Sequence, residues 1–179
     1  MDEQVIFGFH SNFFYCGIAH AIVNMYEYIK AGVDRGEYIY LFMEPDLHNE
    51  IIKKFSDAEK KHIGFLPIND LILQYREYGK SALRNSISHY VEQTLTEGYQ
   101  GVRIIKQPSF EIQQTSKEDF LNFEDNLTDA ISGLNISVMC IYDFDDFINN
   151  RHYIDEQVIS KSFNTHTHKL YQFNLQHII

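Results

Sequence analysis

Short apolar stretches alternate with segments whose apolar residues recur at helical spacing, along almost the whole chain. This alternation limits the fold more than any other feature. Strands separated by helices predict βα units with right-handed crossovers, hence a mostly parallel central sheet covered by helices on both faces. We therefore expect a three-layer α/β/α fold. The expected strands are 5–9, 38–43, 63–66, 101–106, 136–142 and 169–173, and the expected helices are 18–34, about 46–55, 70–97 with a break near Gly79, 117–132 and 151–161.

Length and composition predict one soluble domain over residues 1–179. A chain of this size buries roughly 70 % of its unfolded surface around a single core. The formal net charge of −10 opposes binding to nucleic acid or to anionic lipid. No apolar run approaches the ~20 residues that span a bilayer, the N-terminus does not resemble a signal peptide, and only two cysteines are present, so we expect a cytoplasmic protein without membrane contact.

The predicted topology nominates a ligand site. Ligands of open parallel sheets bind outside the carboxyl ends of the strands, which here are residues 10–15, 44–46, 107–110 and 142–146. We interpret 10–17 as a loop between the first strand and the first helix. It has no glycine–lysine phosphate loop but carries the aromatic pair Phe14 and Tyr15. It therefore predicts an apolar or aromatic-binding pocket, although these rings could equally cover the sheet, and His10 would fix the loop by hydrogen bonding.

Several segments resemble the methanogen/methylotroph, DcmR sensory domain, abbreviated MEDS. They run through nearly the whole chain: His10 with Phe14 and Tyr15, then 31–37, 97–103, 123–127, 140–143 and His166. The resemblance implies a sensory α/β domain that responds to small organic compounds and has a fold similar to the KaiC and RecA ATPases without the phosphate loop. Such domains are usually joined to a histidine kinase or a helix-turn-helix. Neither is recognisable here, so any output would pass to a separate protein. The segment 107–110 departs from the family pattern.

Together, the strand ends and the resemblance predict a set of ligand-binding residues. These are His10, Phe14, Tyr15, Glu44, Arg103, Tyr142, Asp143 and His166. Glu44 could instead be an acid that favours a helix N-terminus. We predict no catalytic residues and no enzyme, because no phosphate loop is present and no catalytic triad can be recognised from spacing. Gly79-Lys80-Ser81 lies in a helical pattern and is not a phosphate loop.

We predict neither a metal nor a cofactor from spacing. The acids 143–146 suit a hard cation, but acids that begin a helix explain them equally. His166 and His168 would share one face if extended, yet no nearby Cys or His completes a tetrahedral set. Cys140, in an apolar run, is expected to be an inert core thiol, and a redox switch with Cys16 has no support from spacing.

The sequence thus predicts a stand-alone sensory or regulatory domain. It would bind a small organic ligand or a signalling protein, such as a histidine kinase or transcription regulator, and act by population shift. The alternative is a degenerate KaiC/RecA-type protein with residual ATP binding, and a third reading is a structural partner of a kinase that has no ligand. A homodimer would suit a dimeric kinase partner.

Overall fold

One seven-stranded sheet organises the protein, whose computed structural model describes residues 7–178. The strands are β1 (His10–Tyr15), β2 (Glu37–Phe42), β3 (Ile63–Phe65), β4 (Gly101–Lys106), β5 (Ile136–Asp143), β6 (His168–Tyr171) and β7 (Asn174–His177). Their order is β3-β2-β4-β5-β1-β6-β7. All neighbouring strands pair in parallel except β6 and β7, which form an antiparallel hairpin at one edge. The expected mostly parallel sheet is confirmed.

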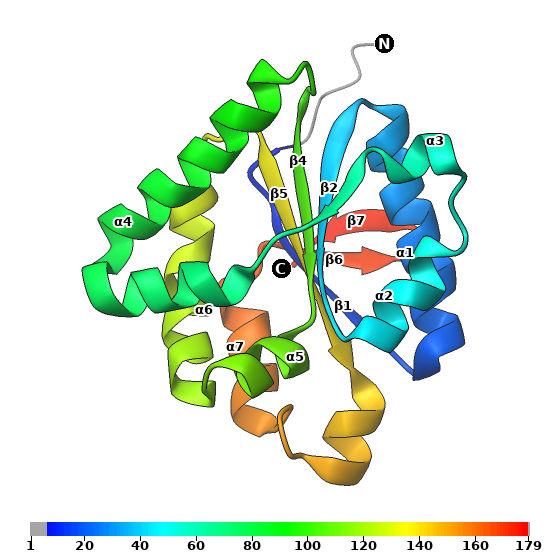
Figure 1. Cartoon of the computed structure of the whole chain (residues 1–179). Coiled ribbons are helices and arrows are strands. Elements are labelled where there is room, and N and C mark those ends of the chain that lie inside the picture. Colours follow the sequence, from blue (N-terminus) through cyan, green and yellow to red (C-terminus); the bar gives the residue numbers. More distant parts are fainter. Residues whose placement is uncertain (1–6, 179) are drawn as a thin grey trace.

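Helices cover both faces of the sheet (Figure 1). They are α1 (Gly17–Asp34), α2 (Pro45–Ile52), α3 (Asp57–Lys60), α4 (Ile68–Thr96), α5 (Pro108–Gln114), α6 (Lys117–Ile131), the π-helical η1 (Asp146–Asn150) and α7 (Glu156–Thr165). α1 and α2 enclose one core with one face of the sheet, and α4 to α7 enclose the second core with the other. The three-layer α/β/α architecture is therefore present.

The residues 10–15 form the strand β1, so our expectation of a loop at 10–17 is wrong. β1 lies between β5 and β6, and its first three side chains, His10, Ser11 and Asn12, are buried. Polar side chains in this run hid the strand, because their partners come from distant segments. Of the expected strand 5–9, residues 5 and 6 lie outside the described residues, and residues 7–9 precede the strand.

The last third of the chain also differs from the expected elements. The helix expected at 151–161 begins five residues later, after η1, because Asp155 caps it through hydrogen bonds from the backbone N–H groups of Gln157 and Val158. The single strand expected at 169–173 is the β6–β7 hairpin. The break near Gly79 in α4 is confirmed, since Gly79 has a φ of 77° and a ψ of −168°. No helix within residues 7–178 is long and apolar enough to cross a membrane.

Candidate functional site

The sheet divides the predicted ligand-binding residues between its two faces and its edge. Alternate residues of a strand point to opposite faces. His10, Phe14, Tyr142 and His166 accordingly lie on the face covered by α6 and α7, whereas Tyr15 and Arg103 lie on the face covered by α1; Glu44 and Asp143 lie at the carboxyl edge. The structure therefore offers three separate environments where the sequence suggested one pocket.

Polar groups converge at the carboxyl edge around Gln107. Its side-chain amide donates to the Tyr15 hydroxyl over 3.1 Å, and its carbonyl oxygen accepts from the Glu44 backbone N–H over 2.9 Å. Burial, reinforced by the Asp143 and Glu44 carboxylates, raises the pKa of Tyr15. Burial also raises the pKa of Asp143, which remains partly exposed. Gln107 belongs to the segment that departs from the family pattern, and it connects the ends of three strands.

Aromatic rings gather beside this edge on the face of α7. Phe14 stacks on Tyr142 with ring centroids 5.1 Å apart and on Phe163 at 5.6 Å, and Phe144 meets it edge-on at 6.3 Å. Phe147 extends the contact from η1 to Phe144. We call these five residues the aromatic group. Phe163 is 53 % exposed, so the group presents an apolar face to solvent at the end of β1 and β5.

Arg103 is occupied within the protein. Its guanidinium donates to both carboxylate oxygens of Glu37 over 2.7 and 3.0 Å and to the Tyr28 carbonyl. The guanidinium also lies 4.2 Å from the centre of the Tyr28 ring. The residue lines a pocket of about 250 Å³ between α1 and the β6–β7 hairpin, which includes Phe173. The guanidinium of Arg103 therefore uses its donors in a buried ion pair with Glu37 and in a hydrogen bond to the Tyr28 carbonyl, and not at the aromatic group.

A buried ion-pair network crosses the other face of the sheet, and the sequence pattern did not predict it. The Lys106 ammonium, at the end of β4, lies 2.8 Å from Glu111 Oε2 in α5 and 2.6 Å from Glu124 Oε1 in α6. All three side chains are buried. Burial raises the pKa of Glu111 to about 7, although the Lys106 ammonium opposes that shift. The sequence predicts that Lys106 ends a buried strand, and only the fold brings the two acids to it.

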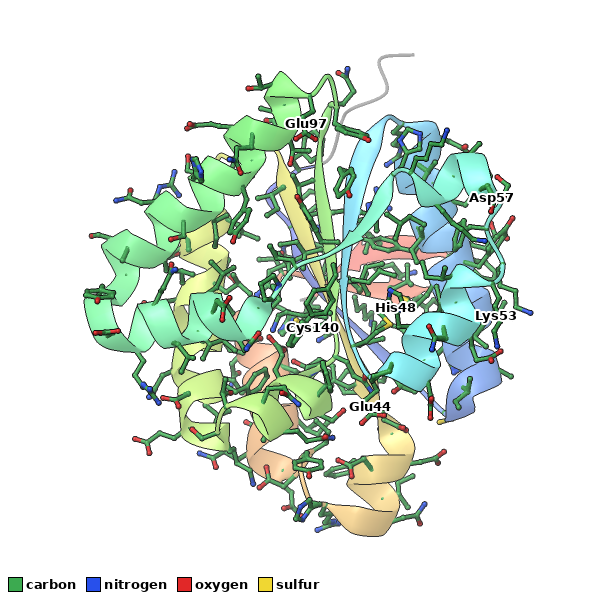
Figure 2. The ribbon with its side chains drawn as sticks, in the orientation of Figure 1. Glu44, His48, Lys53, Asp57, Glu97 and Cys140 are labelled. Atoms are coloured by element: carbon green, nitrogen blue, oxygen red, sulfur yellow. The ribbon has the colours of Figure 1, made fainter. Side chains whose placement is uncertain are left out.

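Three side chains, those of His10, Cys140 and His166, surround the second carboxylate oxygen of Glu124. Glu124 Oε2 lies 3.5 Å from His10 Nε2, 3.7 Å from His166 Nε2 and 4.0 Å from Cys140 Sγ, while His10 Nε2 lies 3.3 Å from Cys140 Sγ. All four ligand-type atoms lie within 4.8 Å of one another. We call His10, Glu124, Cys140 and His166 the buried cluster. Figure 2 shows Cys140 in the interior and Glu44 at the lower end of the sheet.

Hydrogen bonds fix which nitrogen of each buried histidine carries its proton. Thr128 donates its hydroxyl proton to the Thr165 carbonyl, so its oxygen accepts from His10 Nδ1 over 3.0 Å. Thr165 donates to the Lys161 carbonyl, so its oxygen likewise accepts from His166 Nδ1 over 3.1 Å. Both Nε2 atoms therefore carry lone pairs that face the buried cluster.

The surroundings of both imidazoles lower their pKa values and so favour the neutral form. Burial first, and then the Lys106 ammonium, lower the pKa of His166 to about 3. Burial, followed by His166 and Lys106, holds the pKa of His10 well below its ordinary value. The thiol of Cys140 is held in its protonated form, because burial and the nearby Glu124 carboxylate raise its pKa. This combination of two neutral imidazoles, a thiol and a carboxylate is a donor set suited to a cation.

Comparison with models of known families shows to which family this chain belongs. The family model of the methanogen/methylotroph, DcmR sensory domain matches residues 9–167. The chain belongs to the MEDS family. All members of the buried cluster, and the whole aromatic group, lie within the matched residues of this MEDS domain.

Comparisons beyond the family concern the fold. No curated protein matches the chain. Among solved structures, a prototypical ATPase from the type III secretion system of pathogenic bacteria is similar, with a TM-score of 0.54 and 9 % identity over 93 % of this chain. The chain spans about half the length of that ATPase, 52 %. A second similar structure is EssC (ATPases 2 and 3) from Geobacillus thermodenitrificans, with a TM-score of 0.39, 8 % identity and coverage of 90 % of this chain and 31 % of that one. The MEDS domain therefore shares an α/β fold with an ATPase.

The connection from β1 to α1 differs from a phosphate-binding loop. β1 ends at Tyr15 and α1 begins at Gly17, so Cys16 alone separates the strand from the helix. A phosphate loop presents several successive backbone N–H groups to the phosphates. Here the N–H of Cys16 donates to His20 Nδ1 over 3.1 Å. The connection between β1 and α1 in this MEDS domain is therefore too short to form a phosphate-binding loop.

Proposed function

We propose that this MEDS domain senses a small organic molecule, apolar or aromatic, at the aromatic group and passes the change to a signalling protein. The family supports a sensory or regulatory role. The observation that carries the finer proposal is the position of Phe14, whose ring is stacked between the buried Tyr142 and the half-exposed Phe163. A flat apolar ligand would continue this stack at the exposed ring.

Polar groups beside the aromatic group would orient such a ligand. Asp143 is partly exposed at the end of β5, next to Phe144, and its pKa is raised by burial. Ligand sites combine mostly apolar walls with few polar groups that fix orientation. Asp143 is therefore the polar contact that we assign to a hydroxyl or amine of the ligand.

The transmitting element in this proposal is α7 with η1. η1 is a five-residue π-helix, and such segments are frequent at functional sites. Phe147 of η1 and Phe163 of α7 both belong to the aromatic group. Ligand binding would favour one arrangement of these two elements over another, provided that the ligand has different affinities for the two states. A histidine kinase or a transcription regulator is the partner that would read the change.

We extend the domain to all of residues 1–179. The family model ends at residue 167, but β6 pairs with β1 through the registers Ser11–His168 and Asn12–Lys169. The hairpin therefore completes the same sheet, and its removal would expose the edge of β1.

Nucleotide binding is the weaker candidate. The likeness to an ATPase concerns the fold alone, and the single-residue connection after β1 leaves no cradle for phosphates. Calorimetry with ATP and Mg²⁺ is expected to give no heat of binding, and incubation is expected to release no phosphate.

Chemical-shift mapping with phenol and toluene as probes tests the ligand site. We expect shift changes at Phe14, Phe144 and Phe163, and at least a threefold loss of phenol affinity in Phe163→Ala. Phe173→Ala is the matched control, because Phe173 is 55 % exposed but lies on the hairpin. Equal affinity in Phe163→Ala, or shifts confined to the pocket around Phe173 and Arg103, would place the site elsewhere. A co-purification with candidate kinases then tests the output.

A further inference from the structure

The lone pairs of the buried cluster point toward one another. The Nε2 atoms of His10 and His166 are both acceptors, as shown by their threonine partners, and both face the Glu124 Oε2 atom. The single thiol proton of Cys140 can serve His10 over 3.3 Å. His166 Nε2 has no hydrogen-bond donor among residues 7–178. Because acceptors that face one another repel, a cation bound between them would relieve this repulsion.

We propose that the buried cluster of His10, Glu124, Cys140 and His166 binds one transition-metal dication of the Zn²⁺ type. Metal bonds of about 2.0–2.3 Å at tetrahedral angles place ligand atoms about 3.3–3.8 Å apart. Of the six separations among the four ligand atoms, those of 3.3, 3.5 and 3.7 Å lie in this range, the 4.0 Å between Cys140 and Glu124 lies just outside it, and the remaining two are within 4.8 Å. Imidazole and thiolate ligands select zinc-type metals over Mg²⁺ or Ca²⁺.

The surroundings provide the outer contacts that metal ligands require. Each histidine is held through Nδ1 by a threonine hydroxyl, which leaves Nε2 for the metal. Lys106 holds Glu124 by Oε1, so that Oε2 remains for the metal. The ligands are thus oriented by neighbours from α6, α7 and β4.

Charge balance also favours a dication. Without a metal, one ammonium, that of Lys106, faces the carboxylates of Glu111 and Glu124 in the protein interior. On binding, the S–H bond of Cys140 breaks, its proton leaves to solvent, and a metal–sulfur bond forms. The dication and the new thiolate together add one positive charge beside Glu111 and Glu124, two buried acids that share a single ammonium.

The metal would join distant parts of the fold. The ligands come from β1, β5, α6 and the residue that follows α7. A metal there would fix the end of α7, which also carries Phe163, against the sheet. The inference does not depend on the proposed ligand site, because no residue of the aromatic group is a ligand of the metal.

Metal analysis and Co²⁺ substitution of the full chain test the proposal. Protein purified without chelator should contain about one metal ion per chain. After stripping, Co²⁺ should give the intense visible bands of a tetrahedral site together with a thiolate-to-metal charge-transfer band. Zn²⁺ should displace Co²⁺ stoichiometrically, and Phe163→Ala should behave as the native protein does.

Because the chain has two cysteines, single substitutions show which of them binds the metal. Cys16→Ser removes the exposed thiol and should keep the charge-transfer band, because Cys140 is then the one cysteine of the chain. Cys140→Ser and His166→Gln should weaken Co²⁺ binding more than tenfold, whereas His168→Gln, two residues away, should not. Loss of the band in Cys16→Ser, or octahedral Co²⁺ spectra in the native protein, would overturn the proposal. If Cys140→Ser fails to fold, the native protein and Cys16→Ser still decide the outcome.

Discussion

His10 and His166, near opposite ends of the chain, have ring centroids 3.8 Å apart with the ring planes tilted by 31°, and both direct Nε2 to Glu124. The contact connects the first strand of the sheet to the end of α7. Its partners lie on α6, through Thr128, and on α7, through Thr165. A change in the position of α7 must therefore act on this pair.

Replacement of Lys106 by methionine should destabilise the protein by about 3–5 kcal/mol, because Glu111 and Glu124 lose their common counter-ion in the interior. Urea unfolding followed by far-UV circular dichroism measures the difference. Lys161→Met is the control. Its pair with Asp125 is partly solvent-exposed and should contribute less than about 1 kcal/mol. Similar losses in the two variants would contradict the burial of the network.

Arg103→Met should also destabilise the protein by about 3–5 kcal/mol, because Glu37 is left as an unpaired buried carboxylate. The affinity for phenol should stay unchanged, since Arg103 serves the ion pair and not the aromatic group. Denaturant unfolding and a phenol titration separate the two effects. A loss of phenol affinity at full stability would restore Arg103 to the ligand site. Arg151→Met, which removes an exposed pair with Glu156, should change stability little.

Gly79→Ala should lower the free energy of unfolding by about 1–3 kcal/mol. Gly79 has a φ of 77° and a ψ of −168°, a region that is essentially restricted to glycine. No atom lies within 4 Å of a Cβ built at this position, so the cost is backbone strain and not crowding. Thermal unfolding measures the loss. The exposed Ser81→Ala, in the same helix, should be nearly neutral, and a neutral Gly79→Ala would show that the bend in α4 is not required.

Asp155→Ala should destabilise the protein by about 0.5–2 kcal/mol at neutral pH, because Asp155 caps α7. Burial raises the pKa of this carboxyl, but the hydrogen bonds from Lys117 and from backbone N–H groups outweigh it, and the pKa lies below its ordinary value of 3.8. The carboxylate therefore contributes fully above that value, and its contribution falls as the pH drops through the lowered pKa.

Unfolding curves of native protein and Asp155→Ala across acid pH check this sign. The difference between them should shrink as the pH falls below 3.8. A difference that grows on acidification would mean that the carboxyl is not stabilised by its partners.

The sequence predicted those parts of the fold that depend on local pattern. The strand 101–106 and the helix break at Gly79 were found because apolar runs and glycine act within a few residues. The sequence pattern does not predict β1, because its first residues are polar and therefore resemble a loop. Its first residue, His10, acquires its partners Thr128 and Cys140 from elements more than a hundred residues away, and no local pattern records them.

The amino-acid sequence by itself determined the layers of this protein. Helices and strands alternate along the chain, and each has an apolar face that is buried when helices cover both sides of a parallel sheet. Its motifs also pointed to the MEDS family. The tertiary structure alone decided which side chains share a site. Because successive side chains of a strand point to opposite faces of the sheet, Phe14 and Tyr15 lie in different cores. The strand order placed β1 beside β5, so that His10 met Cys140, and the packing of α6 and α7 brought Glu124 and His166 to them.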